Sequence, residues 1–146
     1  MEADGNTIEL AVQLGASALL VIVSTLVHGL GLIGIARLLG LRKERLEKHD
    51  FNLGAVFMMC GMALCLFLLH AVEIVIFAVF YLLVNAVRSF EEALHFSASS
   101  YATLGQAAVY FPDGWGLMGA IEALIGFLLI GWSTAFIVRN VDRLRS

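Results

Sequence analysis

Charged residues are scarce in this 146-residue chain: Asp, Glu, Lys and Arg together make up 14% of it, whereas hydrophobic residues make up 60%. The mean hydropathy is +0.91, which is far above that of a soluble domain. The composition therefore excludes an ordinary soluble protein and indicates a membrane protein. The length allows a single membrane domain covering residues 1–146.

Cysteine is rare as well. Cys60 and Cys65 stand five residues apart within one apolar run, and no C-x-x-C pair occurs. This spacing on a helix is poor for a disulfide, so two free thiols are expected.

Several motifs that would carry other functions are absent. The sequence has no nucleophile elbow, phosphate loop or metal-binding box, so no enzyme, metal site or cofactor is expected. It has no basic stripe for nucleic acid, and no apolar run carries the repeated arginines of a voltage sensor. No sizeable soluble part is present to hold a small-molecule ligand.

Uncharged runs predict three membrane-spanning helices, over about 10–36, 51–87 and 115–138. The first run has no charge for the 27 residues between Glu9 and Arg37, which is enough to cross about 30 Å of hydrocarbon. The second run is interrupted only by Glu73, and the piece after it is too short for a span of its own. One long helix is therefore expected there, giving an all-α fold.

Basic residues predict the orientation. Eight of the nine lysines and arginines fall in the first connection or in the C-terminal tail, which an odd number of spans brings to one side. The positive-inside tendency makes that side cytoplasmic, with the N-terminus outside.

A polar stretch, "SFEEALHFSASSYATLGQAAVYFPDGWG", separates the second and third spans. Its first part predicts a short helix over about 89–102, with Ser89 as N-cap and two glutamates in the first turn. The part that follows has no helical pattern. Irregular backbone survives at membrane depth only where protein buries it or water reaches it, so the stretch predicts a re-entrant pore loop.

Four segments carry a family resemblance: "HGLGL" from His28, "LHAVEI" from Leu69, "FSASSYATLGQA" from Phe96 and "WGLMGAIEALIGFLLIGWSTA" from Trp115. Together they resemble the small bacterial three-span ion channel proteins of the pore-loop potassium channel superfamily. The resemblance implies a homotetrameric cation channel in the bacterial inner membrane, whose partners are its own copies and membrane lipids.

The predicted filter departs from the family pattern T-V-G-Y-G-D. The corresponding residues are Thr103, Leu104, Gly105, Gln106 and Ala107. In potassium filters the Thr hydroxyl and successive carbonyls replace the hydration shell of the ion. Ala107 stands where the second glycine avoids a penalty of about 1–2 kcal/mol. We therefore expect a monovalent cation, potassium or sodium, to pass with weak potassium preference.

Several further residues are candidates for support or gating. Tyr101, Glu122 and Trp115 are expected to support the filter, with Glu122 bracing the loop by hydrogen bonds. Gly126 stands where the superfamily has its gating hinge, although close packing explains it equally well. The other candidates, ionisable groups inside spans, are His28, His70 and Glu73.

His70 and Glu73 share one helix face and form an intramembrane polar pair. Bonding to each other or to a neighbouring helix is the favoured interpretation, and a titrating gate or a metal site is the alternative.

Two other functions stay open. One is a channel-like membrane protein that does not conduct and acts structurally or on a partner. The other is a copper transporter, for which Met58, Met62 and the two cysteines offer soft ligands, although its glycine spacing does not fit.

Overall fold

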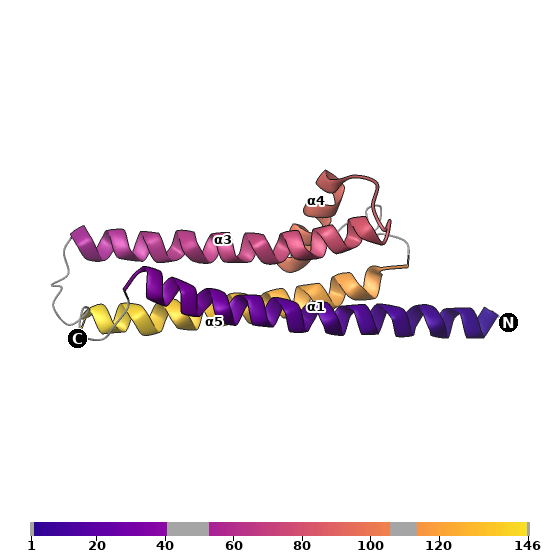
Figure 1. The fold of residues 1–146 in the computed structure, drawn as a ribbon, viewed down its shortest axis with the longest axis horizontal. Coiled ribbons are helices and arrows are strands. Elements are labelled where there is room, and N and C mark those ends of the chain that lie inside the picture. Colours follow the sequence, from indigo (N-terminus) through magenta and orange to yellow (C-terminus); the bar gives the residue numbers. More distant parts are fainter. Residues whose placement is uncertain (1, 41–52, 106–113, 146) are drawn as a thin grey trace.

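The computed structural model describes residues 2–40, 53–105 and 114–145, which form four helices and no strands. They are α1 (Glu2–Leu38), α3 (Leu53–Leu83), α4 (Phe90–Tyr101) and α5 (Gly116–Arg145). The three long helices run along one axis, with α3 opposite in direction to α1 and α5, and the two termini lie at opposite ends (Figure 1). The short α4 lies at the end where α3 finishes.

Three of these helices are long and apolar enough to cross a membrane: Glu9–Leu38, Val56–Leu83 and Gly116–Asp142. The predicted all-α fold with three long apolar helices is confirmed. Only 28%, 22% and 28% of their most apolar windows are buried within the chain, so most of the apolar surface faces outward, as it does in lipid or against further copies.

The second long helix ends earlier than the sequence predicted. α3 finishes at Leu83, whereas the expected span runs on to 87. Asn85 takes a positive φ of 54°, and the amides of Asn85 and Ala86 bond back to the carbonyls of Leu82 and Tyr81. This pattern is a Schellman turn, which closes a helix with a left-handed residue.

Two apolar clusters form the core, one toward each end of the bundle. The first surrounds Phe77, Tyr81 and Phe96, and includes Met118 and Leu129. The second contains Leu32, Ile35, Met62 and Leu66. On every long helix the buried ionisable or hydroxyl residues His28, Glu73 and Ser133 fall between the two clusters in sequence. A polar layer therefore separates them.

Candidate functional site

The start of α4 is fixed by its own side chains. The amide of Glu92 donates to Ser89 Oγ at 3.2 Å, and the amide of Arg88 donates to Glu92 Oε2 at 3.0 Å. Glu91 and Glu92 occupy the first turn, where the helix dipole favours negative charge. The predicted N-cap at Ser89 is confirmed.

Glycines on α5 allow α4 to pack closely against it. A Cβ on Gly119 would lie 3.0 Å from the ring of Phe96, and a Cβ on Gly126 would overlap the backbone carbonyl of Tyr101. Gly126 is therefore a close-packing residue at the end of α4. By contrast, a Cβ on Gly131 would meet nothing within 4 Å.

The last turn of α4 reaches far along its neighbours. Tyr101 contacts Gly126 through its backbone and Glu73 through its hydroxyl. Gly126 is ten residues from the start of α5, and Glu73 is ten residues from the end of α3. At 1.5 Å per residue, both positions lie about 15 Å along these helices from that side.

Two groups of hydrogen bonds join α4 to the long helices. The first is centred on Glu122, which is fully buried. Tyr81 donates to Glu122 Oε2 at 2.8 Å, and Ser97 Oγ contacts Glu122 Oε1. Ser97 Oγ also lies 2.8 Å from the carbonyl oxygen of Ile74. Glu122 therefore joins α3, α4 and α5. Its described bonds reach the short helix, whereas the sequence predicted that it braces the filter loop, part of which lies outside the described residues.

The hydrogens of this first contact can be counted. Tyr81 and Ser97 bring one hydroxyl hydrogen each, which makes two. The three contacts Tyr81–Glu122, Ser97–Glu122 and Ser97–Ile74 need one hydrogen each, which makes three. A third hydrogen is available if Glu122 carries a proton. Glu122 then donates to Ser97 Oγ, and Ser97 donates to the carbonyl of Ile74. The geometry therefore suits a neutral carboxyl group.

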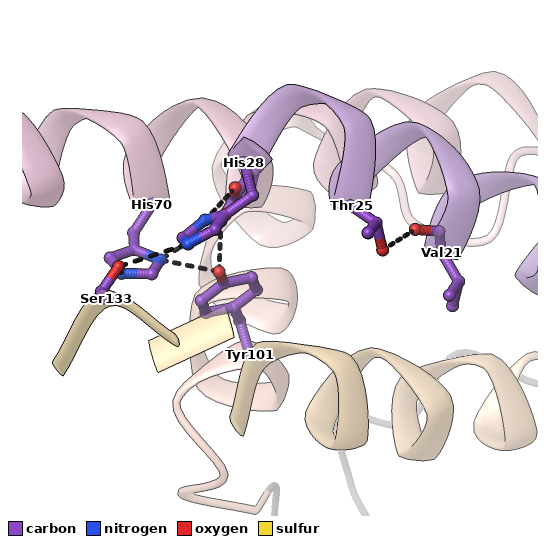
Figure 2. A network of polar contacts seen from close by, with 7 residues as sticks. Val21, Thr25, His28, His70, Tyr101 and Ser133 are labelled. Atoms are coloured by element: carbon purple, nitrogen blue, oxygen red, sulfur yellow. Dashed lines mark hydrogen bonds and ion pairs between the residues drawn. The ribbon is translucent and has the colours of Figure 1, made fainter. Parts of the chain in front are cut away.

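The second polar contact centres on Glu73 and includes residues from all four helices. His28 Nδ1 lies 2.8 Å from Glu73 Oε1, and His70 Nδ1 lies 3.2 Å from Glu73 Oε2. The Tyr101 hydroxyl donates to the same Oε2 and lies 2.8 Å from His70 Nδ1. Figure 2 shows the two imidazoles, Tyr101 and Ser133 pointing toward one another.

Ser133 closes this arrangement from α5. Its Oγ lies 3.0 Å from His70 Nε2 and 3.4 Å from His28 Nε2. We call the five residues the Glu73 cluster: His28, His70, Glu73, Tyr101 and Ser133. His28 and Glu73 are fully buried, whereas the side chain of His70 is 18% exposed. The sequence predicted that His70 and Glu73 bond to each other or to a neighbouring helix, and both kinds of contact are present. The partners on the other helices, His28, Tyr101 and Ser133, were not predicted.

Donors surround Glu73 on both oxygens. His28, His70 and Tyr101 all direct N–H or O–H groups at it when the imidazoles carry hydrogen on Nδ1. This environment suits an ionised carboxylate, in contrast to that of Glu122. The rings of His28 and Trp132 also lie 5.3 Å apart, so an aromatic side chain lies beside the cluster.

The end of α4 is unusual in its backbone. The amides of Thr103 and Leu104 donate to the carbonyls of Ser100 and Ser99, which is again a Schellman turn. The left-handed position is held by Thr103 with φ 57°. A β-branched residue rarely takes this conformation, and the strain costs about 1–2 kcal/mol. Comparable turns use Gly40 after α1 and Asn85 after α3.

The three residues that follow Ala102 after α4 are not covered by other parts of the same chain. Thr103, Leu104 and Gly105 are exposed, with Leu104 at 79%, and Gly105 has φ 71°. Gln106 and Ala107, the rest of the predicted filter, lie outside the described residues.

The remaining predicted residues are Trp115 and the four possible soft metal ligands. Trp115 packs its ring 5.5 Å from that of Phe80, near the end of α3. Met62 is buried in the second apolar cluster, with Met58 and Cys65 packed at its edge. Cys60 is exposed and, like Cys65, a free thiol, as expected.

Some functional candidates were not foreseen from the sequence. Tyr81, Ser97 and Ser133 have no motif that marks them, although Ser97 and Tyr101 are four residues apart and so share one face of a helix. On α1, Ser17 and Ser24 are buried and their Oγ atoms have no partner in the described part of the chain. A helical repeat of hydroxyl residues leading to His28 is a signal in the sequence that could have marked this face of α1.

Comparison with protein-family models, with curated proteins and with solved structures found no match to this chain.

Proposed function

We propose that this chain forms a homotetrameric pore-loop channel for monovalent cations, potassium or sodium, with weak potassium preference. The observation that carries the proposal is the position of the last turn of α4. Its Tyr101 packs against Gly126 and Glu73, about 15 Å along both neighbouring helices, and exposed backbone follows it.

That exposed backbone supports a water-filled axis. Thr103, Leu104 and Gly105 are exposed in the single chain. Backbone groups at this level cannot face lipid, since each unsatisfied group costs several kcal/mol there. They require either protein from other copies or water, and a central pore provides both.

The electrostatics of α4 favour a cation at the same place. The C-terminal end of a helix carries partial negative charge, and no basic residue stands in the last turn of α4 to neutralise it. Half-helix C-termini coordinate cations in other membrane transport proteins. The strained Thr103 is a further indication, because strained residues collect at functional sites.

Several copies are needed, because one short helix and one loop cannot enclose an ion. Closed cyclic symmetry is the usual solution, and the resemblance to pore-loop channels favours four. The long helices present large exposed apolar side chains that suit lipid and neighbouring copies, among them Leu30, Phe67 and Phe127.

The weak selectivity is inferred from the sequence of the filter. Thr103, Leu104 and Gly105 retain the inner part of the potassium pattern, whereas Gln106 and Ala107 replace the aromatic residue and the second glycine. We propose that the inner rings coordinate the cation and that the outer half is wider. The basic residues on one side favour a cytoplasmic C-terminus in a bacterial inner membrane.

Ion flux into liposomes tests the proposal. The reconstituted protein is expected to pass potassium and sodium at comparable rates, and a large organic cation much more slowly. Thr103→Ala is expected to change the ratio of the two rates. Its matched control is Thr134→Ala, because the Thr134 hydroxyl donates to the carbonyl of Ile130 in its own helix at 2.9 Å.

Two results would count against this proposal. A strong preference for potassium over sodium would contradict the wide outer half. A stable tetramer without any flux would favour the alternative of a non-conducting, structural membrane protein.

A further inference from the structure

The Glu73 cluster has the donor set of a transition-metal site. One ligand atom from each of His28, His70 and Glu73 lies within 4.8 Å of the other two. Two imidazole nitrogens and a carboxylate oxygen suit Zn²⁺ and related divalent ions. From the sequence, only His70 and Glu73 are seen together, and two ligands are too few to hold a metal. The packing of α1 on α3 adds the third.

The present contacts are close to those that a metal needs. The Nδ1 atoms of His28 and His70 lie 2.8 and 3.2 Å from the two oxygens of Glu73. Ligands at about 2.1 Å in a tetrahedral site are about 3.4 Å apart. A bound ion would therefore require only small side-chain movements, and Tyr101 or water is available as a fourth ligand.

Ser133 provides the second argument. Both imidazoles turn Nε2 toward its Oγ, at 3.0 and 3.4 Å. If both Nδ1 atoms carry hydrogen, two Nε2 acceptors share the single hydroxyl hydrogen of Ser133. If both Nδ1 atoms bind a metal, each Nε2 carries a hydrogen and the two lone pairs of Ser133 accept both. Metal-binding histidines characteristically donate their other N–H to such a partner.

Access and charge also fit. The side chain of His70 is 18% exposed, whereas His28 and Glu73 are fully buried, so His70 is the ligand that an entering ion can reach first. A buried carboxylate requires a compensating positive charge. None of the hydrogen bonds described for the Glu73 cluster involves Lys or Arg.

We infer that His28, His70 and Glu73 form a binding site for a divalent transition-metal ion, supported by Ser133, that fastens α1 to α3 beneath the end of α4. This inference goes beyond ion conduction, and it is tested by binding alone. Its failure would leave the channel proposal standing.

The experiment uses the full chain in detergent, with Cys60 and Cys65 replaced by Ser to remove soft ligands and with no histidine tag. After chelator treatment, Co²⁺ is added and its visible absorption and stoichiometry are measured. One Co²⁺ per chain is expected, with the spectrum of a nitrogen–oxygen site, displaced by Zn²⁺. Zn²⁺ is also expected to raise the unfolding temperature.

Variants identify the ligands. His70→Gln and Glu73→Gln are expected to lose stoichiometric binding, and Ser133→Ala to weaken it by about 10- to 100-fold. His95→Gln is the matched control, because His95 is exposed on α4, and it should bind as the parent does.

The parent protein decides the question even if a variant fails to fold. Absence of Co²⁺ binding by the folded parent would overturn the inference and leave a proton as the compensating charge. Undiminished binding by a folded His70→Gln or Glu73→Gln variant would overturn it as well.

Discussion

The two buried carboxyl groups under α4, Glu122 and Glu73, are both fully buried, yet their surroundings differ. Glu122 meets two hydroxyl groups, one of which already has a backbone carbonyl in reach. Glu73 meets two imidazoles and a phenol. The first set has too few hydrogens for an ionised carboxylate, whereas the second has enough.

This difference assigns different tasks to two residues that look alike in the sequence. A neutral Glu122 braces the middle of α4 without creating charge in the membrane. An ionised Glu73 holds the end of α4 and attracts a cation, either a proton on the imidazoles or a metal ion. The distinction depends on neighbours from other helices, so neither residue type nor depth in a span could predict it.

The largest expected effect comes from exchanging each carboxyl group for an amide. Glu73→Gln brings N–H hydrogens into a cluster already filled with donors, and we expect a loss of about 3 kcal/mol or more in the free energy of unfolding. Glu122→Gln replaces a neutral group with another of the same shape, and a loss below about 1 kcal/mol is expected. Denaturation in mixed detergent micelles measures both. Equal losses would remove the distinction between the two sites.

A bulkier residue at Gly126 tests the close packing of α4 on α5, on which the contacts of both carboxyl groups with α4 depend. Gly126→Val would force the carbonyl of Tyr101 away from α5 and is expected to cost about 1–3 kcal/mol. Gly131→Val is the control, since a Cβ there meets nothing within 4 Å. If both variants unfold alike, α4 does not pack on α5 as described.

Removal of single hydroxyl groups sharpens the comparison further. Tyr101→Phe removes a bond to an ionised group and is expected to cost about 1.5–3 kcal/mol, whereas Tyr81→Phe removes a bond to a neutral group and is expected to cost about 0.5–1.5 kcal/mol. The same micelle denaturation compares them. The reverse order would indicate that Glu122, and not Glu73, is the charged residue.

The smallest effect is expected at Thr103, where stability should rise. Thr103→Gly relieves the left-handed strain, and we expect a gain of about 1 kcal/mol. Asn85→Gly, at the same position of the turn after α3, should gain less, since Asn tolerates this conformation. If Thr103 lines the pore, the stabler variant should also lose its normal ion flux. Unchanged flux would mean that the strain serves no channel function.

Much of the fold follows from the sequence. Uncharged runs predict the three long helices, and Ser89 with the two glutamates predicts the start of α4, because both signals are local. The end of α3 is less predictable, since apolar residues continue past Leu83 and a left-handed Asn85 stops the helix.

The candidate sites are only half predictable for a different reason. His70 and Glu73 are neighbours on one helix, so their contact follows from spacing. His28 and Ser133 come from other helices, 45 and 63 residues away from Glu73 and His70. Only the packing of the bundle brings them together, and no local pattern in one sequence contains that information.

The most direct measurement of the central claim is a map of the assembled protein in a lipid nanodisc with potassium present. The account predicts four copies around an axis, with Thr103, Leu104 and Gly105 facing it at mid-depth and ion density beside Thr103. A map in which these residues face lipid, or lie flat at the outer surface of an assembly without a central opening, would contradict it.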